Sequence, residues 1–192
     1  MKKTAPDTSR LVFISVMAAI ICVVTLLRFP LLGSKVHFAN ALCLLAGMLF
    51  GGVGGGLAAG LGSALYDGLL GGYDIFQCLI TFVSKFLMAF ICARIAWGGG
   101  ARAERHGRNA VACVAGALSY VALYMLKTFV YQKFIYAYPA DAVWLTMLGK
   151  LPASLINAAV AMIAAPILYA GLLPALKKTG ILEKLRPRTP ES

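Results

Sequence analysis

Long apolar runs alternate with short polar segments along the whole chain. The apolar runs cover residues 11–29, 38–50, 57–70, 75–97, 109–131 and 142–176. Because roughly 20 helical residues cross the hydrocarbon core of a bilayer, each run is interpreted as a membrane-spanning helix. The second and third runs are short, so they require shallow tilt or burial among neighbouring helices. The pattern predicts an all-α integral membrane protein, a compact bundle of about six transmembrane helices.

Composition supports this interpretation. Hydrophobic residues make up 60% of the chain, charged residues 13%, and the mean hydropathy is +0.82. One water-soluble domain of 192 residues does not have this much apolar surface. We expect a single membrane domain over residues 1–192, with short cytoplasmic tails at about 1–10 and 177–192. The basic start lacks a small-x-small cleavage site, so the first run is predicted to be an uncleaved span. Pro152, Pro166 and Pro174 offer places for the last segment to kink or end.

The distribution of basic residues predicts the orientation. One set of segments holds Lys2, Lys3, Arg10, Arg102, Arg105, Arg108, Lys177, Lys178, Lys184, Arg186 and Arg188, whereas the opposite loops hold Arg28, Lys35 and Lys133. Because cytoplasmic loops of membrane proteins are enriched in Lys and Arg, both termini are predicted to be cytoplasmic. The net charge of +11 then mostly reflects topology. Anionic lipid head groups are sufficient partners for it, and nucleic-acid binding is not indicated.

Polar residues recur at helical spacing on three of the predicted spans. The stripes are Gln77, Thr81 and Lys85 on the fourth span, Tyr120, Tyr124, Lys127 and Tyr131 on the fifth, and Lys150, Ser154 and Asn157 on the sixth. With the predicted orientation, all three occupy the outer half of the membrane. An ionisable group at membrane depth is costly and indicates a functional site. We therefore expect the stripes to face one cavity open to the outside.

Each stripe also has a purely structural interpretation. Lys127 and Lys150 are near helix ends and can snorkel to lipid head groups, and tyrosines are common in the interfacial belt. Lys85 lies deeper in its span and needs a partner, which is Asp67, a ligand or water. The loop over residues 30–40 is long enough to cap a pocket with His37 and Asn40, although a lone loop histidine is often only solvated.

Other motifs indicate packing rather than chemistry. Gly47 and Gly51, then Gly52, Gly56 and Gly60, recur every four residues, which permits close contact between membrane helices. This region lacks the Gly-Lys-Ser/Thr ending of a phosphate loop. The cysteines all fall in apolar runs without metal-ligand spacing, so neither a metal site nor a cofactor is expected. No hydrolase motif is present, and the chain is not expected to be an enzyme.

The chain resembles the substrate-binding S components of energy-coupling factor (ECF) transporters. The similarity is carried by size and span count, by the glycine-rich stretch NALCLLAGMLFGGVGGGLAAGLGSALYD at residues 40–67, and by LPASLIN at residues 151–157. The resemblance implies a protein of the bacterial cell membrane that binds a water-soluble vitamin or vitamin precursor outside. It further implies delivery inward together with a transmembrane coupling protein and two ATPase subunits. Docking onto that coupling protein would use a small-residue face on the first helix, here Ser15 and Ala19.

The resemblance places the pocket where the stripes already indicate one. The residues expected to bind substrate are Gln77, Thr81, Lys85, Tyr124, Lys127, Tyr131, Lys150, Ser154 and Asn157, with His37 and Asn40 as lid contacts. Three lysines against Asp67 favour a carboxylate, a phosphate or an electron-rich ring, as in pantothenate, a pyridoxine-type vitamer, a flavin or a folate. A cationic thiamine fits less well.

Two other functions remain open. In a non-transport membrane scaffold or assembly factor, the small-residue faces bind partner helices and the lysines pair with Asp67 or lipid phosphate. In a stand-alone facilitator or channel, the stripes line a continuous path. A channel requires polar residues in the inner half too, and residues 110–116 and 158–173 are nearly all apolar.

Overall fold

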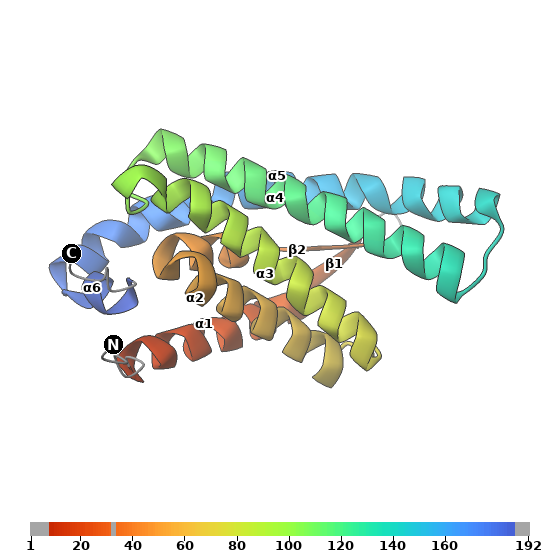
Figure 1. The fold of residues 1–192 in the computed structure, drawn as a ribbon, viewed down its shortest axis with the longest axis horizontal. Coiled ribbons are helices and arrows are strands. Elements are labelled where there is room, and N and C mark those ends of the chain that lie inside the picture. The colour runs from red at the N-terminus through yellow and green to blue at the C-terminus, as the bar shows by residue number, and fades with distance from the viewer. Residues whose placement is uncertain (1–7, 32–33, 187–192) are drawn as a thin grey trace, which may run out of the picture.

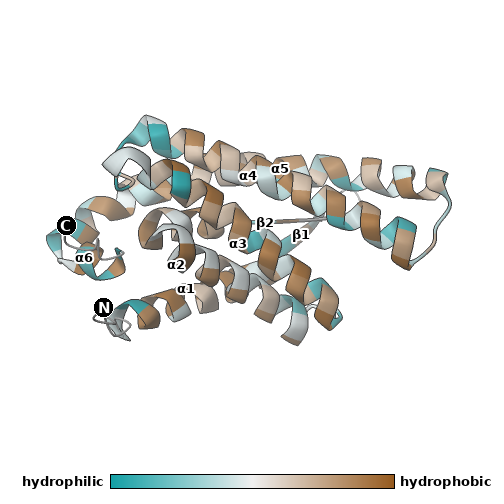
Figure 2. Cartoon of the chain, in the orientation of Figure 1, coloured by the Kyte–Doolittle hydropathy of each residue, from teal (hydrophilic) through white to brown (hydrophobic). Residues whose placement is uncertain are grey.

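Five long helices dominate the computed structural model, which describes residues 8–31 and 34–186 (Figure 1). They are α1 (Thr8–Leu26), α2 (Ala39–Leu69), α3 (Ile75–Trp97), α4 (His106–Val130) and α5 (Ala140–Lys178), followed by the short α6 (Ile181–Leu185). A 3-10 turn, η1 (Gly98–Gly100), follows α3, and a π-helical turn, η2 (Tyr131–Ile135), extends α4. All five long helices are apolar enough to span a membrane. Figure 2 shows hydrophobic positions predominating along them.

Helix α2 is two helices joined at a sharp reversal. Gly51 has φ 75° and ψ −174°, a conformation that favours glycine because a side chain would be strained there. Beyond it the chain returns along its own path: a Cβ on Gly55 would lie 2.5 Å from the Cα of Gly47. Further from the turn, the sulfur of Cys43 lies 3.9 Å from the hydroxyl of Ser63. The two short apolar runs therefore form an antiparallel pair, and the predicted bundle of about six helices is confirmed.

Both described chain ends lie at one end of the bundle. Arg10 on α1 donates hydrogen bonds to the carbonyl of Leu185 at 3.3 Å and to that of Phe50 at 2.8 Å. The start of α1, the turn at Gly51 and α6 are thus neighbours, as Figure 1 shows. We call this the terminal end. The opposite end carries a two-stranded hairpin.

That hairpin corrects two expectations about the chain after the first span. The span ends at Leu26 rather than at residue 29, because Arg28–Leu31 (β1) pairs antiparallel with Ser34–His37 (β2). The segment 30–40, expected to be a loop, is therefore a strand pair leading directly into α2. Asn40 belongs to the first turn of α2 and not to the loop.

The last helix also differs from expectation. Helix α5 runs for 39 residues through Pro152, Pro166 and Pro174 without ending, although each proline was a predicted kink or end. The C-terminal tail expected from residue 177 is helical in part, since α5 ends at Lys178 and α6 follows. The remaining tail residues, 1–7 and 187–192, lie outside the described chain.

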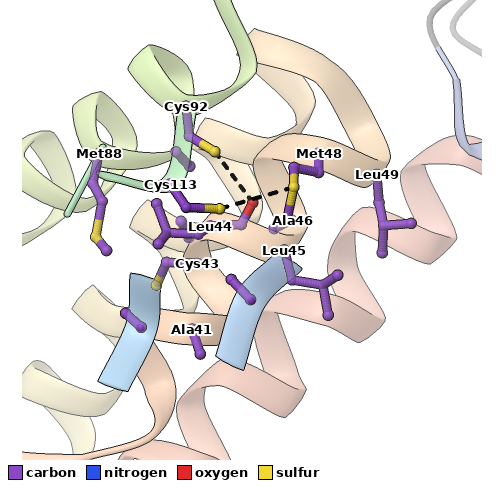
Figure 3. Close-up of a cluster of buried hydrophobic side chains, with 14 of the residues drawn as sticks. Ala41, Cys43, Leu44, Leu45, Ala46, Met48, Leu49, Met88, Cys92 and Cys113 are labelled. Carbon is purple, nitrogen blue, oxygen red and sulfur yellow. Dashed lines mark hydrogen bonds between the residues drawn. The ribbon is translucent and has the colours of Figure 1, made fainter. Parts of the chain in front are cut away.

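Close packing fills the terminal half of the bundle (Figure 3). Cys92 donates to the carbonyl of Leu44 at 3.8 Å, and the sulfurs of Cys113 and Met48 lie 4.0 Å apart, so these cysteines are small packing residues. A Cβ on Gly47 would lie 2.5 Å from the carbonyl oxygen of Ala89. Phe82, Phe86 and Phe90 on α3 cover Gly60, Gly56 and Gly52 respectively. The glycine spacing thus serves helix contact, as small residues do between membrane helices.

Candidate ligand-binding site

A cavity of about 400 Å³ opens at the hairpin end of the bundle. Its wall is built by the end of α1, by both arms of α2, by α3, α4, η2 and α5, and by the hairpin. Every residue expected to contact substrate lines it: Gln77, Thr81, Lys85, Tyr124, Lys127, Tyr131, Lys150, Ser154, Asn157, His37 and Asn40. Small-molecule sites in proteins typically have volumes of this order. The geometry brings the three polar stripes together, and their role in binding stays a prediction.

The stripe on α3 is oriented by the cap of that helix. Asp74 precedes the first turn, where its carboxylate accepts hydrogen bonds from the backbone N–H of Gln77 at 3.0 Å and from the Gln77 amide at 2.7 Å. These hydrogen bonds lower the pKa of Asp74. A capping carboxylate satisfies an otherwise unpaired N–H of the first turn. The cap therefore defines where α3 begins, and the four-residue spacing places Gln77, Thr81 and Lys85 on one face of that helix.

Lys85 is almost fully buried in the cavity wall. Its side chain is 3% exposed, donates a hydrogen bond to the side-chain oxygen of Asn40, and places its ammonium 3.6 Å from the centre of the Tyr120 ring. A cation over an aromatic face is stabilised electrostatically. Asp67 lines the same cavity, but among the described residues Lys85 makes no ion pair with it. The Lys85–Asp67 pair considered from the sequence is therefore not formed.

The other two lysines also face the cavity. The ammonium of Lys127 donates to the hydroxyl of Thr81 at 3.3 Å and lies 5.8 Å from the centre of the Tyr73 ring. Lys150 is partly buried in the cavity wall. Snorkelling would direct both ammonium groups to lipid head groups. Their position in the cavity wall favours the pocket interpretation.

A hydrogen bond joins the hairpin to α5 beside the cavity. The backbone N–H of His37 donates to the side-chain oxygen of Asn157 at 2.8 Å. Burial, together with the positive charges of Lys85 and Arg28, lowers the pKa of His37 to about 3, so its ring is neutral at physiological pH. Its Nδ1 is buried and has no partner among the described residues. That atom is available to a ligand.

Several lining residues were not among the expected contacts. They are Thr25, Arg28, Ser63, Tyr66, Asp67, Tyr73, Ser84, Tyr120, Thr128, Gln132 and Tyr136. Ser63, Tyr66 and Asp67 lie at helical spacing on the second half of α2, a signal that the glycine pattern obscured. The π-helical turn η2 puts both Tyr131 and Gln132 in the wall. Sequence spacing alone does not indicate a π-turn.

The proposed docking face on α1 is exposed. Ser15 and Ala19 both point away from the bundle, whereas Ile14 and Ala18 are buried in it. Small residues on an exposed helix face permit close approach of another helix in lipid. Docking itself stays a prediction.

Comparison with known proteins was made on sequence and on structure. A family model described as ECF-type riboflavin transporter, S component, matches residues 6–174. A solved structure described as the S component of a bacterial ECF transporter is 20% identical, with a TM-score of 0.69 over 88% of this chain and 98% of that chain. At this identity the likeness concerns the fold alone. The search against curated proteins gives no match.

Proposed function

Because the chain belongs to the family of ECF-type riboflavin transporter S components, we propose that it captures a water-soluble vitamin or vitamin precursor from outside the cell. It then delivers that ligand inward with an energy-supplying module. ATP hydrolysis is assigned to partner ATPase subunits, since the chain carries no nucleotide-binding motif.

The observation that carries the proposal is a polar cavity with an apolar floor. Beyond Lys85, α3 continues with Met88, Ala89 and Cys92, and each is fully buried. Polar lining that stops halfway through the bundle supports reversible binding of a ligand rather than a continuous path for it. This favours a receptor over a stand-alone facilitator.

The cavity wall is suited to a vitamin with a flat ring. Six tyrosines line it: Tyr66, Tyr73, Tyr120, Tyr124, Tyr131 and Tyr136. Tyrosines enclose an aromatic body and present hydroxyls for hydrogen bonds. The candidates are a flavin, a folate, a pyridoxine-type vitamer and the non-aromatic pantothenate. The family description names riboflavin, which makes flavins the first class to test.

Orientation and partners follow from the charge pattern and the exposed face of α1. We propose a bacterial cell membrane location, with the hairpin end outside and the terminal end, which holds most of the basic residues, in the cytoplasm. Ser15 and Ala19 would contact a transmembrane coupling protein, which carries two ATPase subunits. Anionic lipids would neutralise the remaining basic residues.

Native mass spectrometry of the detergent-purified chain tests the proposal. We expect one small molecule per chain, released on denaturation, and displacement of that ligand by one member of a panel of water-soluble vitamins. A flavin would also lose fluorescence on binding beside the tyrosines. A folded chain that carries no ligand and ignores the whole panel would instead support the membrane scaffold.

A further inference from the structure

The cavity wall carries more positive than negative charge. Arg28, Lys85, Lys127 and Lys150 line it, whereas Asp67 is the one carboxylate in the described lining. Bringing charge away from water is costly unless an opposite charge or several hydrogen bonds compensate. The described lining therefore has a surplus of cations that its single carboxylate does not compensate.

Neutral groups surround most of these cations. Lys85 contacts Asn40 and the Tyr120 ring, and the guanidinium of Arg28 lies 5.0 Å from the centre of the Tyr66 ring. Asp67 lines the same cavity, but it forms no ion pair within 4.0 Å among the described residues. The ammonium groups of Lys85 and Lys127 are therefore not paired with a carboxylate in the described lining.

Lys127 and Lys150 retain the most capacity to bind an anion. Both side chains line the same cavity, and neither forms an ion pair with a described residue. An ammonium has three donors, and Lys127 uses one of them on Thr81. Lys150 makes no hydrogen bond or ion pair to any described residue. An anion in the cavity would accept their unused hydrogen bonds and compensate their charge.

On the premise of the proposed function, we infer that the transported ligand carries an anionic group, a carboxylate or a phosphate, that is bound by Lys127 and Lys150 in the cavity wall. Its uncharged part lies among the tyrosines. His37 Nδ1 and Gln132 Oε1, both buried without a partner in the described chain and both on residues that line the cavity, provide further polar contacts. Neutral molecules of the same shape are therefore poorer ligands.

Matched pairs of ligands test this inference. Each pair shares one skeleton and differs in the anionic group: riboflavin and riboflavin 5′-phosphate, pyridoxal and pyridoxal 5′-phosphate, panthenol and pantothenate. Affinities are measured on the full-length chain in detergent. We expect, for the skeleton that binds, an affinity at least about tenfold higher for the anionic member, the size of one charge-assisted hydrogen bond. The pair that shows the preference identifies carboxylate or phosphate.

Variants then locate the anionic group. The double variant Lys127→Gln/Lys150→Gln is expected to bring the two affinities of the pair together while the neutral member still binds. Lys127→Arg/Lys150→Arg preserves the charges and should preserve the preference. This control distinguishes the loss of charge in the glutamine variant from a fold defect. Lys133→Gln, which removes an exposed cation outside the cavity, is the matched control and should change neither affinity.

The outcomes separate the two proposals. A neutral member that binds as tightly as its anionic partner overturns the inference and leaves the receptor function standing. A preference that survives the double glutamine variant overturns the assignment to Lys127 and Lys150. If no member of any pair and no vitamin of the panel binds to a folded chain, the proposed function itself fails.

Discussion

The two ends of the bundle differ in whether their charged side chains form ion pairs. At the terminal end, Glu104 accepts a hydrogen bond from the nearly buried Arg186 at 2.8 Å and lies 3.5 Å from the ammonium of Lys177. At the hairpin end, the lysines of the cavity face hydroxyls, an amide and tyrosine rings. Charges paired within the chain attach one element to another, here α6 and α5 to the turn before α4. Charges left without a carboxylate in a concave wall are available to a ligand.

Packing also differs between the two ends of the bundle. The terminal half is filled by glycine contacts and by small side chains, among them Ala89, Cys92 and Ala112, which are fully buried. The hairpin half encloses the cavity. We therefore expect changes in the terminal half to alter stability and changes in the hairpin half to alter binding.

The largest effect on stability is expected for Gly47→Val. A Cβ at this position would lie 2.5 Å from the backbone oxygen of Ala89, and backbone does not move aside as a flexible side chain does. Overpacking of this kind should cost roughly 3 kcal/mol. For a chain of this size that lowers the Tm by roughly 6–12 °C, measured by thermal unfolding in detergent.

Gly149→Ala is the control for this variant. No atom lies within 4 Å of a Cβ at that position, and alanine favours the helix. Its Tm should be unchanged or slightly higher. An equal loss of stability in both variants would mean that the close contact of α2 with α3 is not what stabilises the terminal half.

The largest effect on binding is expected for Lys85→Gln combined with Lys127→Gln. Hydrogen bonds to charged groups contribute about 1.5–3 kcal/mol each, so affinity for the native ligand should fall by at least about 100-fold. The Tm of the ligand-free protein should change far less than in Gly47→Val. Ligand titration measures the affinity, with Lys133→Gln as control; an unchanged affinity would place the binding site elsewhere.

A smaller effect on stability is expected for Glu104→Gln. Loss of the carboxylate removes a charge-assisted hydrogen bond to Arg186, which we put at about 1 kcal/mol after allowing for the exposure of Glu104. The Tm should fall by roughly 2–4 °C while ligand affinity is unchanged. A large change in affinity would contradict the separation of the two ends.

The pH dependence of this variant gives an independent test. The hydrogen bond from Arg186 holds the pKa of Glu104 below its usual 4.5. A lowered pKa in the folded state stabilises the protein above 4.5, and this stabilisation is lost as the pH falls through the folded-state value. Wild type and Glu104→Gln should therefore differ in Tm at neutral pH and converge in acid. A difference that persists in acid would exclude Glu104 ionisation as its cause.

The smallest effect is expected at the hairpin. Asn157→Ala removes the acceptor for the backbone N–H of His37, a hydrogen bond worth about 1 kcal/mol. Ligand release should become roughly fivefold faster in stopped-flow measurements, because the hairpin is held less firmly over the cavity. Asn157→Asp retains an acceptor and should release ligand more slowly than Asn157→Ala. Equal release rates for these two variants would show that the bond does not control access.

Much of the fold was predictable because its signals are local. Apolar runs located the helices, and the six-helix count holds because Gly51 divides α2 into two antiparallel helices. The hairpin was not predicted, since strand pairing over residues 28–37 depends on contact between two short segments with no strong alternation. The uninterrupted course of α5 through three prolines was not predicted either. Neighbouring helices, not the proline alone, decide whether a membrane helix is interrupted.

The candidate site shows the same division. Helical spacing placed Lys85, Lys127 and Lys150 on polar faces without knowledge of their neighbours. It proposed Asp67, a ligand or water as the partner of Lys85 and did not identify Asn40, because that contact joins two helices that are far apart in the sequence. Nor could it place Arg28 and Tyr66 in the cavity wall. The position of Arg28 depends on the pairing of the hairpin strands, and that of Tyr66 depends on the reversal of α2 at Gly51.

By itself, the sequence determined that this chain spans a membrane as a helical bundle, that its basic residues gather at one end, and that three helices each carry a polar face. These properties follow from the spacing and hydropathy of residues within one segment. Tertiary structure alone decided that a hairpin adds Arg28 and His37 to the cavity, that Lys85 bonds to Asn40 rather than Asp67, and that Arg186 meets Glu104. Such contacts join residues far apart in the chain, so they exist only once the helices have packed.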